Sequence, residues 1–131
     1  LILNTIESNS DLPQLVTNRH FSETIYSGSA CFFPRQDSNT CFVLTGKYVP
    51  DILAKLCAFD LRDKNFKNLQ VSQTIVARIS TTIIRNDLSH CCCFYLLIDS
   101  AYSSYLWDVL IDAMEEYSGA VVGVESLKLL T

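Results

Sequence analysis

The stretch from His90 to Asp99, HCCCFYLLID, constrains the fold more than any other part of the sequence. Side chains alternate between the two faces of a β-strand, and both faces of this one would be apolar. A strand with no polar side is one that is covered on both sides. We therefore predict a central strand that lies under helices or is pressed against a second sheet or a subunit. One face would carry Cys91, Cys93, Tyr95 and Leu97, and the other Cys92, Phe94, Leu96 and Ile98.

Three adjacent thiols beside a histidine raise a second interpretation, a metal or redox site. A closed zinc site needs four ligands, usually arranged as spaced pairs. The other cysteines (Cys31, Cys41 and Cys57) are isolated, and His20 and His90 belong to no CxxC or HxxxH pattern. Consecutive cysteines in a strand point to opposite faces and cannot form a disulfide without strain. We predict buried, reduced thiols that pack as small hydrophobic side chains, no metal site, and a reducing compartment, the cytoplasm.

Bulk composition excludes several classes of function. The chain of 131 residues is long enough for one domain, 1–131, and is 49% apolar and 18% charged. Its net charge is −4 and its basic residues are scattered, so we expect no nucleic-acid partner. The longest apolar run, Cys91 to Ile98, is far shorter than the ~20 residues of a membrane span. No signal-peptide pattern opens the chain, and its start at Leu1 indicates that upstream residues are missing.

The spacing of apolar residues predicts the order strand, helix, strand, strand, strand, helix, strand. The reversal between the second and third of these strands is placed near Ser80 and Thr81, unless the two form one bent strand. An additional strand at 24–33 would form a hairpin with 41–46 through the polar loop 34–40, and a short strand is predicted at 1–6. The five strands of the main series are predicted at 41–46, 72–80, 81–87, 91–98 and 120–126.

Two helices are marked by their end signals. The first starts near Pro50, which fits a first helical turn, and Asp51 is favoured there by the helix dipole. The second runs over 101–117 after a cap at Asp99 or Ser100, and Gly119 stops it. The elements together predict an α+β fold with both helices on one face of the sheet, close to a ferredoxin-like βαββαβ unit with an added β-hairpin.

The second helix has an apolar flank beside its core stripe. Trp107 and Ile111 lie there at i and i+4. A second apolar stripe either widens the core face or contacts a partner, because aromatic anchors are typical of interfaces. We name Trp107, Ile111 and Tyr105 as candidate partner contacts.

No motif for chemistry occurs in the chain. GxGxxG, GxxxxGK[ST] and GxSxG patterns are absent. The acidic residues of the second helix, Asp108, Asp112 and Glu116, follow each other at i,i+4, which is typical of a solvated surface. Cys57 has no histidine near it in sequence that could lower the pKa of its thiol. We therefore predict an interaction or scaffold domain with no catalytic, cofactor-binding or metal-binding residues.

Three segments resemble the gamma subunit of heterotetrameric sarcosine oxidase: VLTGKYVPDILAKLCAFDL (43–61), SQTIVARISTTIIRND (72–87) and FYLLIDSAYSSYLWDVLIDAMEEY (94–117). The chain departs from the family at Lys47, which is usually proline, at Val109, which is usually tryptophan, and in the loop 34–40, which looks like an insertion. A related complex such as N-methylglutamate dehydrogenase is therefore an alternative. The residues that match the family patterns are Lys55, Cys57, Asp60 and Leu61; Thr74 and Ala77; and Ser100, Tyr105, Leu106, Trp107 and Leu110.

The resemblance implies a subunit without a redox cofactor of its own. In that family the fold is similar to the first part of the folate-binding aminomethyltransferase domain of the glycine cleavage T protein. The partners would be the alpha, beta and delta subunits, chiefly alpha, and the other subunits would hold FAD, FMN, NAD and tetrahydrofolate. The complex oxidises sarcosine to glycine and hydrogen peroxide and passes the one-carbon unit to tetrahydrofolate.

Two other functions are compatible with the sequence. A stand-alone folate-binding or aminomethyl-transferring domain would need an acid in the strand region after the first helix, where 72–87 offers only Asp87. A ferredoxin-like binding or regulatory domain with another ligand is the third possibility.

Overall fold

The computed structural model describes residues 38–123 and 125–127, which all belong to one compact unit, 36–131. The predicted strands 1–6 and 24–33, and the hairpin that the latter would form with 41–46, lie outside the described residues. A single domain over 1–131 therefore stays a prediction. Among the described residues, no helix is both long enough and apolar enough to cross a membrane.

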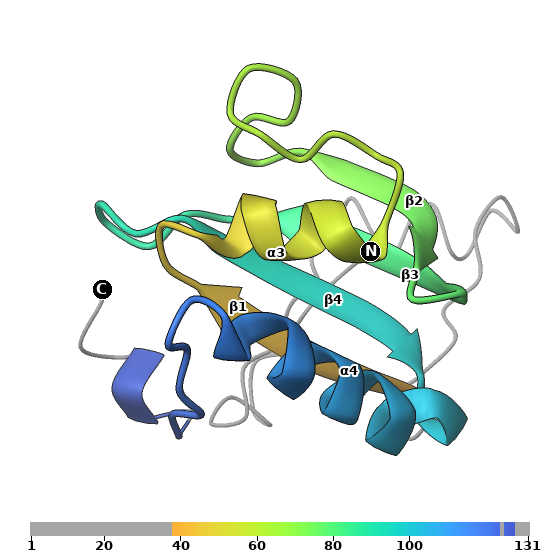
Figure 1. Cartoon of the computed structure of the whole chain (residues 1–131). Helices are drawn as coiled ribbons and strands as arrows, with labels where there is room; N and C mark the ends of the chain where they lie inside the picture. The colour runs from red at the N-terminus through yellow and green to blue at the C-terminus, as the bar shows by residue number, and fades with distance from the viewer. Residues whose placement is uncertain (1–37, 124, 128–131) are drawn as a thin grey trace, which may run out of the picture. The chain divides into compact units, whose positions relative to one another are not determined.

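A four-stranded antiparallel sheet forms the centre of this unit (Figure 1). Its strands are β1 (Asn39–Thr45), β2 (Val71–Val76), β3 (Ile79–Arg85) and β4 (Cys93–Asp99), in the spatial order β1-β4-β3-β2. β4 pairs with β1 on one side and with β3 on the other. The central position predicted for the stretch CFYLLID is confirmed.

Two helices, α3 (Val49–Leu56) and α4 (Ser103–Glu115), cover the same face of the sheet (Figure 1). Pro50 and Asp51 lie in the first turn of α3, as predicted. A short 3-10 turn, η1 (Ser100–Tyr102), precedes α4, and the Asp99 side chain accepts a hydrogen bond from the backbone N–H of Ala101 at 2.9 Å. The predicted α+β fold with both helices on one face is confirmed.

The hydrophobic core lies between the helices and the sheet. Phe94, Leu96 and Ile98 point from β4 into this layer and are almost completely buried. Leu53 from α3 and Leu106 from α4 meet them from the other side. Burying side chains of this size contributes about 1.5–3 kcal/mol each. The remaining core residues are Val49, Leu61, Phe66, Val76, Ile79, Ile83 and Leu110.

The strand was predicted to include all three cysteines from Cys91 to Cys93, but only Cys93 lies in it. β4 begins at Cys93, which is completely buried, whereas Cys91 and Cys92 precede it and are partly buried. Leu88 and Cys91 exchange backbone hydrogen bonds of 3.0 and 2.9 Å across a tight turn, in which Ser89 has a φ of 52°. Because the backbone of Cys91 bonds to Leu88 within the turn between β3 and β4, Cys91 is part of that turn. The strand β4 therefore begins only at Cys93.

Two further expectations are corrected by the backbone. The reversal between β2 and β3 lies at Ala77 and Arg78, whose φ angles of 49° and 70° form a two-residue turn with both central residues left-handed, rather than at Ser80 and Thr81. No strand forms among the described residues of 120–126, and the ferredoxin-like βαββαβ unit therefore lacks its last strand. β2, β3 and β4 instead follow one another as an antiparallel meander.

Gly119 ends α4 as predicted, by a specific hydrogen-bonding arrangement. Its N–H donates to the Met114 carbonyl at 3.0 Å, and the Ser118 N–H donates to the Glu115 carbonyl at 3.0 Å. Ser118 takes the left-handed position of this cap, with a φ of 53°. A Cβ on Gly119 would lie 2.8 Å from the Cβ of Met114, so the close return of the chain requires glycine there.

Candidate functional site

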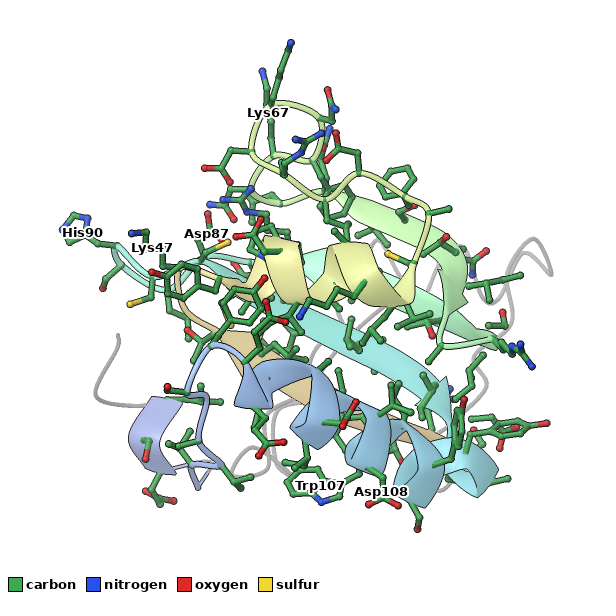
Figure 2. The ribbon with its side chains drawn as sticks, viewed as in Figure 1. Lys47, Lys67, Asp87, His90, Trp107 and Asp108 are labelled. Carbon is green, nitrogen blue, oxygen red and sulfur yellow. The ribbon has the colours of Figure 1, made fainter. Side chains whose placement is uncertain are left out.

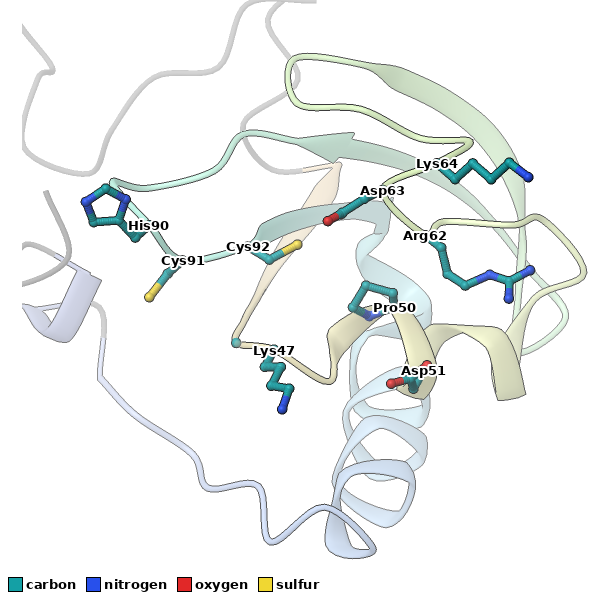
Figure 3. Close-up of a pocket in the computed structure, with 10 residues that line it drawn as sticks. Lys47, Pro50, Asp51, Arg62, Asp63, Lys64, His90, Cys91 and Cys92 are labelled. Atoms are coloured by element: carbon teal, nitrogen blue, oxygen red, sulfur yellow. The ribbon is translucent and has the colours of Figure 1, made fainter.

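A cavity of about 590 Å³ opens beside the turn between β3 and β4 (Figure 3). In Figure 3 the Cys92 thiol and the Asp63 carboxylate point toward each other, whereas Lys47, Lys64 and His90 point outward. The cavity is lined by Gly46, Lys47, Pro50, Asp51, Arg62, Asp63, Lys64, His90, Cys91 and Cys92.

The charged groups behind this cavity are already paired. Arg85 is 6% exposed, and its guanidinium donates to both carboxylate oxygens of Asp87 at 2.8–3.2 Å and to the Phe66 carbonyl at 2.7 Å. It also forms an ion pair with Asp63 at 2.5 Å and lies over the Phe94 ring, 5.6 Å from its centroid. Hydrogen bonds from Arg85 lower the pKa of Asp87. This arrangement fixes the loop between α3 and β2 against the β3–β4 turn.

Two thiols at this end of the sheet, Cys92 and Cys93, are held in the neutral form. Burial raises the pKa of Cys92 to about 11, and burial likewise raises the pKa of Cys93. A nucleophilic cysteine needs the opposite shift. Within the described residues, no group of three or more His, Cys, Asp or Glu side chains is arranged to hold a metal ion. The cavity therefore contains the neutral Cys92 thiol and the Asp63 carboxylate, which forms an ion pair with Arg85, beside Cys91 and His90.

A second, apolar groove of about 180 Å³ lies between β1, α4 and the segment 119–122. The rings of Phe42 and Trp107 lie 6.0 Å apart between centroids across it. Trp107 is 42% exposed, and Val121 and Val122 are 58% and 59% exposed. Figure 2 shows Trp107 and Asp108 projecting from the same outer side of α4. The groove is lined by Phe42, Val43, Leu44, Thr45, Val49, Ile52, Trp107, Leu110, Ile111, Met114 and residues 119–122.

This apolar groove brings together two of the three candidate partner contacts. Trp107 and Ile111 both line it, whereas Tyr105 is 50% exposed and does not. Whether any of the three contacts a partner stays a prediction. Sequence reasoning missed Phe42, Val121 and Val122. Val121 and Val122 were assigned to a strand. Their place in the sequence, shortly after the glycine that ends α4, was the signal that could have placed them next to that helix.

Several of the residues that match the family patterns stabilise the fold. Leu61, Leu106 and Leu110 lie in the core. The Asp60 carboxylate accepts hydrogen bonds from the Arg62 backbone at 3.1 Å and from its guanidinium at 2.8 Å, which lowers the pKa of Asp60 strongly. These bonds turn the chain after α3.

Another residue that matches the family patterns, Lys55, connects the two helices. Lys55 forms an ion pair with Glu116 and lies 4.8 Å from the Tyr117 ring centroid, and Tyr48 stacks on Tyr117 at 5.2 Å. The matching residue Lys55 thus ties the end of α3 to the end of α4. The position of Lys55 indicates a structural role in this contact.

Comparison with known proteins gives a similarity of fold. No family model and no curated protein matches this chain. Among solved structures, a chain of heterotetrameric sarcosine oxidase from Corynebacterium sp. U-96, in complex with pyrrole 2-carboxylate, matches with a TM-score of 0.62 and 23% sequence identity. The match covers 81% of this chain and 55% of that chain, so this chain spans about half of its length. The protein therefore shares its α+β fold with part of a chain from a heterotetrameric sarcosine oxidase.

Proposed function

We propose that this chain is a non-catalytic, gamma-type subunit of a heterotetrameric, flavin-dependent sarcosine oxidase. The observation that carries the proposal is the fold match over 81% of the chain to a chain of such an enzyme. The sequence resemblance over 43–61, 72–87 and 94–117 points to the same family, and these segments form α3, β2, β3, most of β4 and α4.

The size of the matched chain favours a small subunit. The aligned 81% of 131 residues is about 106 residues, which at 55% coverage gives a matched chain of about 190 residues, the size of one or two domains. A chain that small is not the expected carrier of several flavin and nucleotide sites. The proposal therefore assigns this protein to the part of the assembly that packs on a larger flavin-bearing subunit.

The chemistry of the cavity beside the β3–β4 turn supports a role without catalysis. Burial raises the pKa of Cys92, one of its two thiols, to about 11, and Asp63 forms an ion pair with Arg85. The Cys92 thiol is therefore not activated as a nucleophile near neutral pH. Under this proposal the alpha, beta and delta subunits hold FAD, FMN, NAD and tetrahydrofolate, and this chain binds none of them. The complex would oxidise sarcosine to glycine.

The proposal is tested by co-expressing the full chain, carrying an affinity tag, with a candidate large, flavin-bearing subunit of a sarcosine oxidase. Co-purification of flavin absorbance with the tagged chain at a fixed ratio is the expected result. The control is the same tagged chain co-expressed with an unrelated flavoprotein, which should not be retained.

The competing function is tested on the isolated chain. Calorimetric titration with tetrahydrofolate should release no binding heat if this chain is a packing subunit. A saturable titration, together with failure to retain the flavin-bearing subunit, would overturn the proposal in favour of a stand-alone folate-binding or aminomethyl-transferring domain.

A further inference from the structure

The apolar groove between β1, α4 and 119–122 has the size of a side-chain pocket. Its volume of about 180 Å³ is below the ~300–1,000 Å³ of typical small-molecule sites. Trp107, Val121 and Val122 are each more than two-fifths exposed around it. Large aromatic and aliphatic side chains gathered around a small pocket are typical of places where a partner inserts one or two anchor residues.

The solvent side of α4, next to this groove, is acidic. Asp108 follows Trp107, Asp112 follows Ile111, and Glu115 lies one helical turn beyond Ile111. All three carboxylates are exposed, and α4 contains no basic residue. The nearby Lys55 pairs with Glu116 and also attracts Asp112, so Asp108 and Glu115 carry the negative charge of this side that Lys55 does not offset. An occupant of the groove therefore meets negative charge along the solvent side of α4.

We propose that the groove receives a segment of a partner subunit that carries one or two large apolar anchors flanked by Lys or Arg. The inference rests on the proposal that the chain is a subunit, and it adds the chemistry of the partner's segment. The apolar anchors would enter beside Phe42, Trp107 and Ile111, and the basic side chains would face Asp108 and Glu115. Opposite charges around an apolar centre raise the association rate and reject acidic segments.

The single tryptophan of the chain makes the test direct. Trp107 lines the groove, so its fluorescence reports on an occupant. The full chain is titrated with two peptides of equal length and equal leucine spacing, one with lysine and one with glutamate at the polar positions. The lysine peptide should shift Trp107 emission to shorter wavelength and bind at least tenfold more tightly than the glutamate peptide. Raising the ionic strength to about 1 M, where the Debye length is about 3 Å, should remove most of this difference.

Variants test whether the acidic residues of α4, rather than acidic residues elsewhere on the surface, contribute to peptide binding. The combined change Asp108→Asn, Asp112→Asn and Glu115→Gln should weaken binding of the lysine peptide about tenfold, since three exposed charge pairs are lost. Single changes Asp108→Asn and Asp51→Asn form a matched pair, because both carboxylates are exposed but only Asp108 is next to a residue that lines the groove, Trp107. Only the first should weaken binding. Equal binding of both peptides, or no binding of either, would overturn the inference.

Assembly with the flavin-bearing subunit distinguishes this inference from the proposed function. If the triple variant assembles as tightly as the wild-type chain, the groove is not where the partner binds, and the subunit proposal stands. If the wild-type chain fails to assemble but still selects the lysine peptide, the groove inference holds and the proposed oxidase role fails.

Discussion

Replacing Arg85 by methionine should destabilise the protein by about 3 kcal/mol. Methionine keeps an unbranched side chain over the Phe94 ring but removes every donor of the guanidinium. The Phe66 carbonyl would lose its 2.7 Å bond to Arg85, and an unpaired buried acceptor costs about 1–3 kcal/mol. Asp87 would lose a bidentate partner worth about 1–2 kcal/mol, since its side chain is only 21% exposed. Asp63 adds almost nothing, because its side chain is 80% exposed.

Urea unfolding followed by Trp107 fluorescence measures this loss as a shift in midpoint at constant m-value. The control is Asp63→Asn, which should change the free energy of unfolding by less than about 0.5 kcal/mol. The reasoning is refuted if Arg85→Met costs under 1 kcal/mol, or if Asp63→Asn costs as much as Arg85→Met.

The ion pair between Arg85 and Asp87 should make the stability of the folded protein fall at acid pH. Hydrogen bonds from Arg85 lower the pKa of Asp87 in the folded state. The stability from this pair is therefore present above about pH 4, the unfolded value for an aspartate, and is lost as the pH falls through the folded value. Arg85→Met should flatten this acid loss in unfolding curves measured between pH 6 and pH 3, whereas an unchanged slope would contradict the assignment.

Four further substitutions test the backbone geometry and one unpaired hydroxyl, and thermal unfolding measures the effect of each. Ser118→Gly and Arg78→Gly should each stabilise the chain by about 0.5–1 kcal/mol, because both positions have positive φ. Gly119→Ala should destabilise it by about 1–3 kcal/mol, because the added Cβ meets Met114; a neutral effect would contradict the cap. Thr45→Val should stabilise by about 1 kcal/mol, since the Thr45 hydroxyl is buried without a hydrogen-bond partner; a loss would mean that it has one.

The elements that sequence predicted well are those with local signals. β4 is apolar on both faces, and the structure buries Phe94, Leu96 and Ile98 under the helices while Tyr95 and Leu97 are half-buried on the other face. Pro50 lies in the first turn of α3, the Asp99 side chain caps the 3-10 turn that leads into α4, and the Gly119 N–H bonds to the Met114 carbonyl where α4 ends. Such signals need no knowledge of tertiary contacts.

The turns were misplaced along the chain, because neither glycine nor asparagine occupies their left-handed positions. Ala77, Arg78 and Ser89 adopt positive φ angles that glycine or asparagine usually takes. A pattern search therefore extended one strand to Ser80 and another back to Cys91. Tertiary pairing imposed the reversals, since the Ala77 N–H donates to the Leu56 carbonyl at 2.8 Å and the register of β3 with β4 sets the rest.

Some of the residues that line the apolar groove could be predicted from the sequence, and others could not. Trp107 and Ile111 could be identified from their i,i+4 spacing outside the core stripe of α4. Phe42 could not, because it is about 65 residues away in sequence and reaches Trp107 only through the pairing of β1 with β4. The segment 119–122 was expected to extend the sheet, yet the glycine-dependent cap places it against the groove instead.

Hydrogen–deuterium exchange on the complex with the flavin-bearing subunit tests the central claim most directly, because it locates the partner contact on this chain. The account predicts slower exchange in peptides that cover 105–122 and 41–45 when the partner binds, with unchanged exchange in the loop 62–69. Protection confined to the cavity around Cys92, or no protection anywhere on the chain, would contradict it.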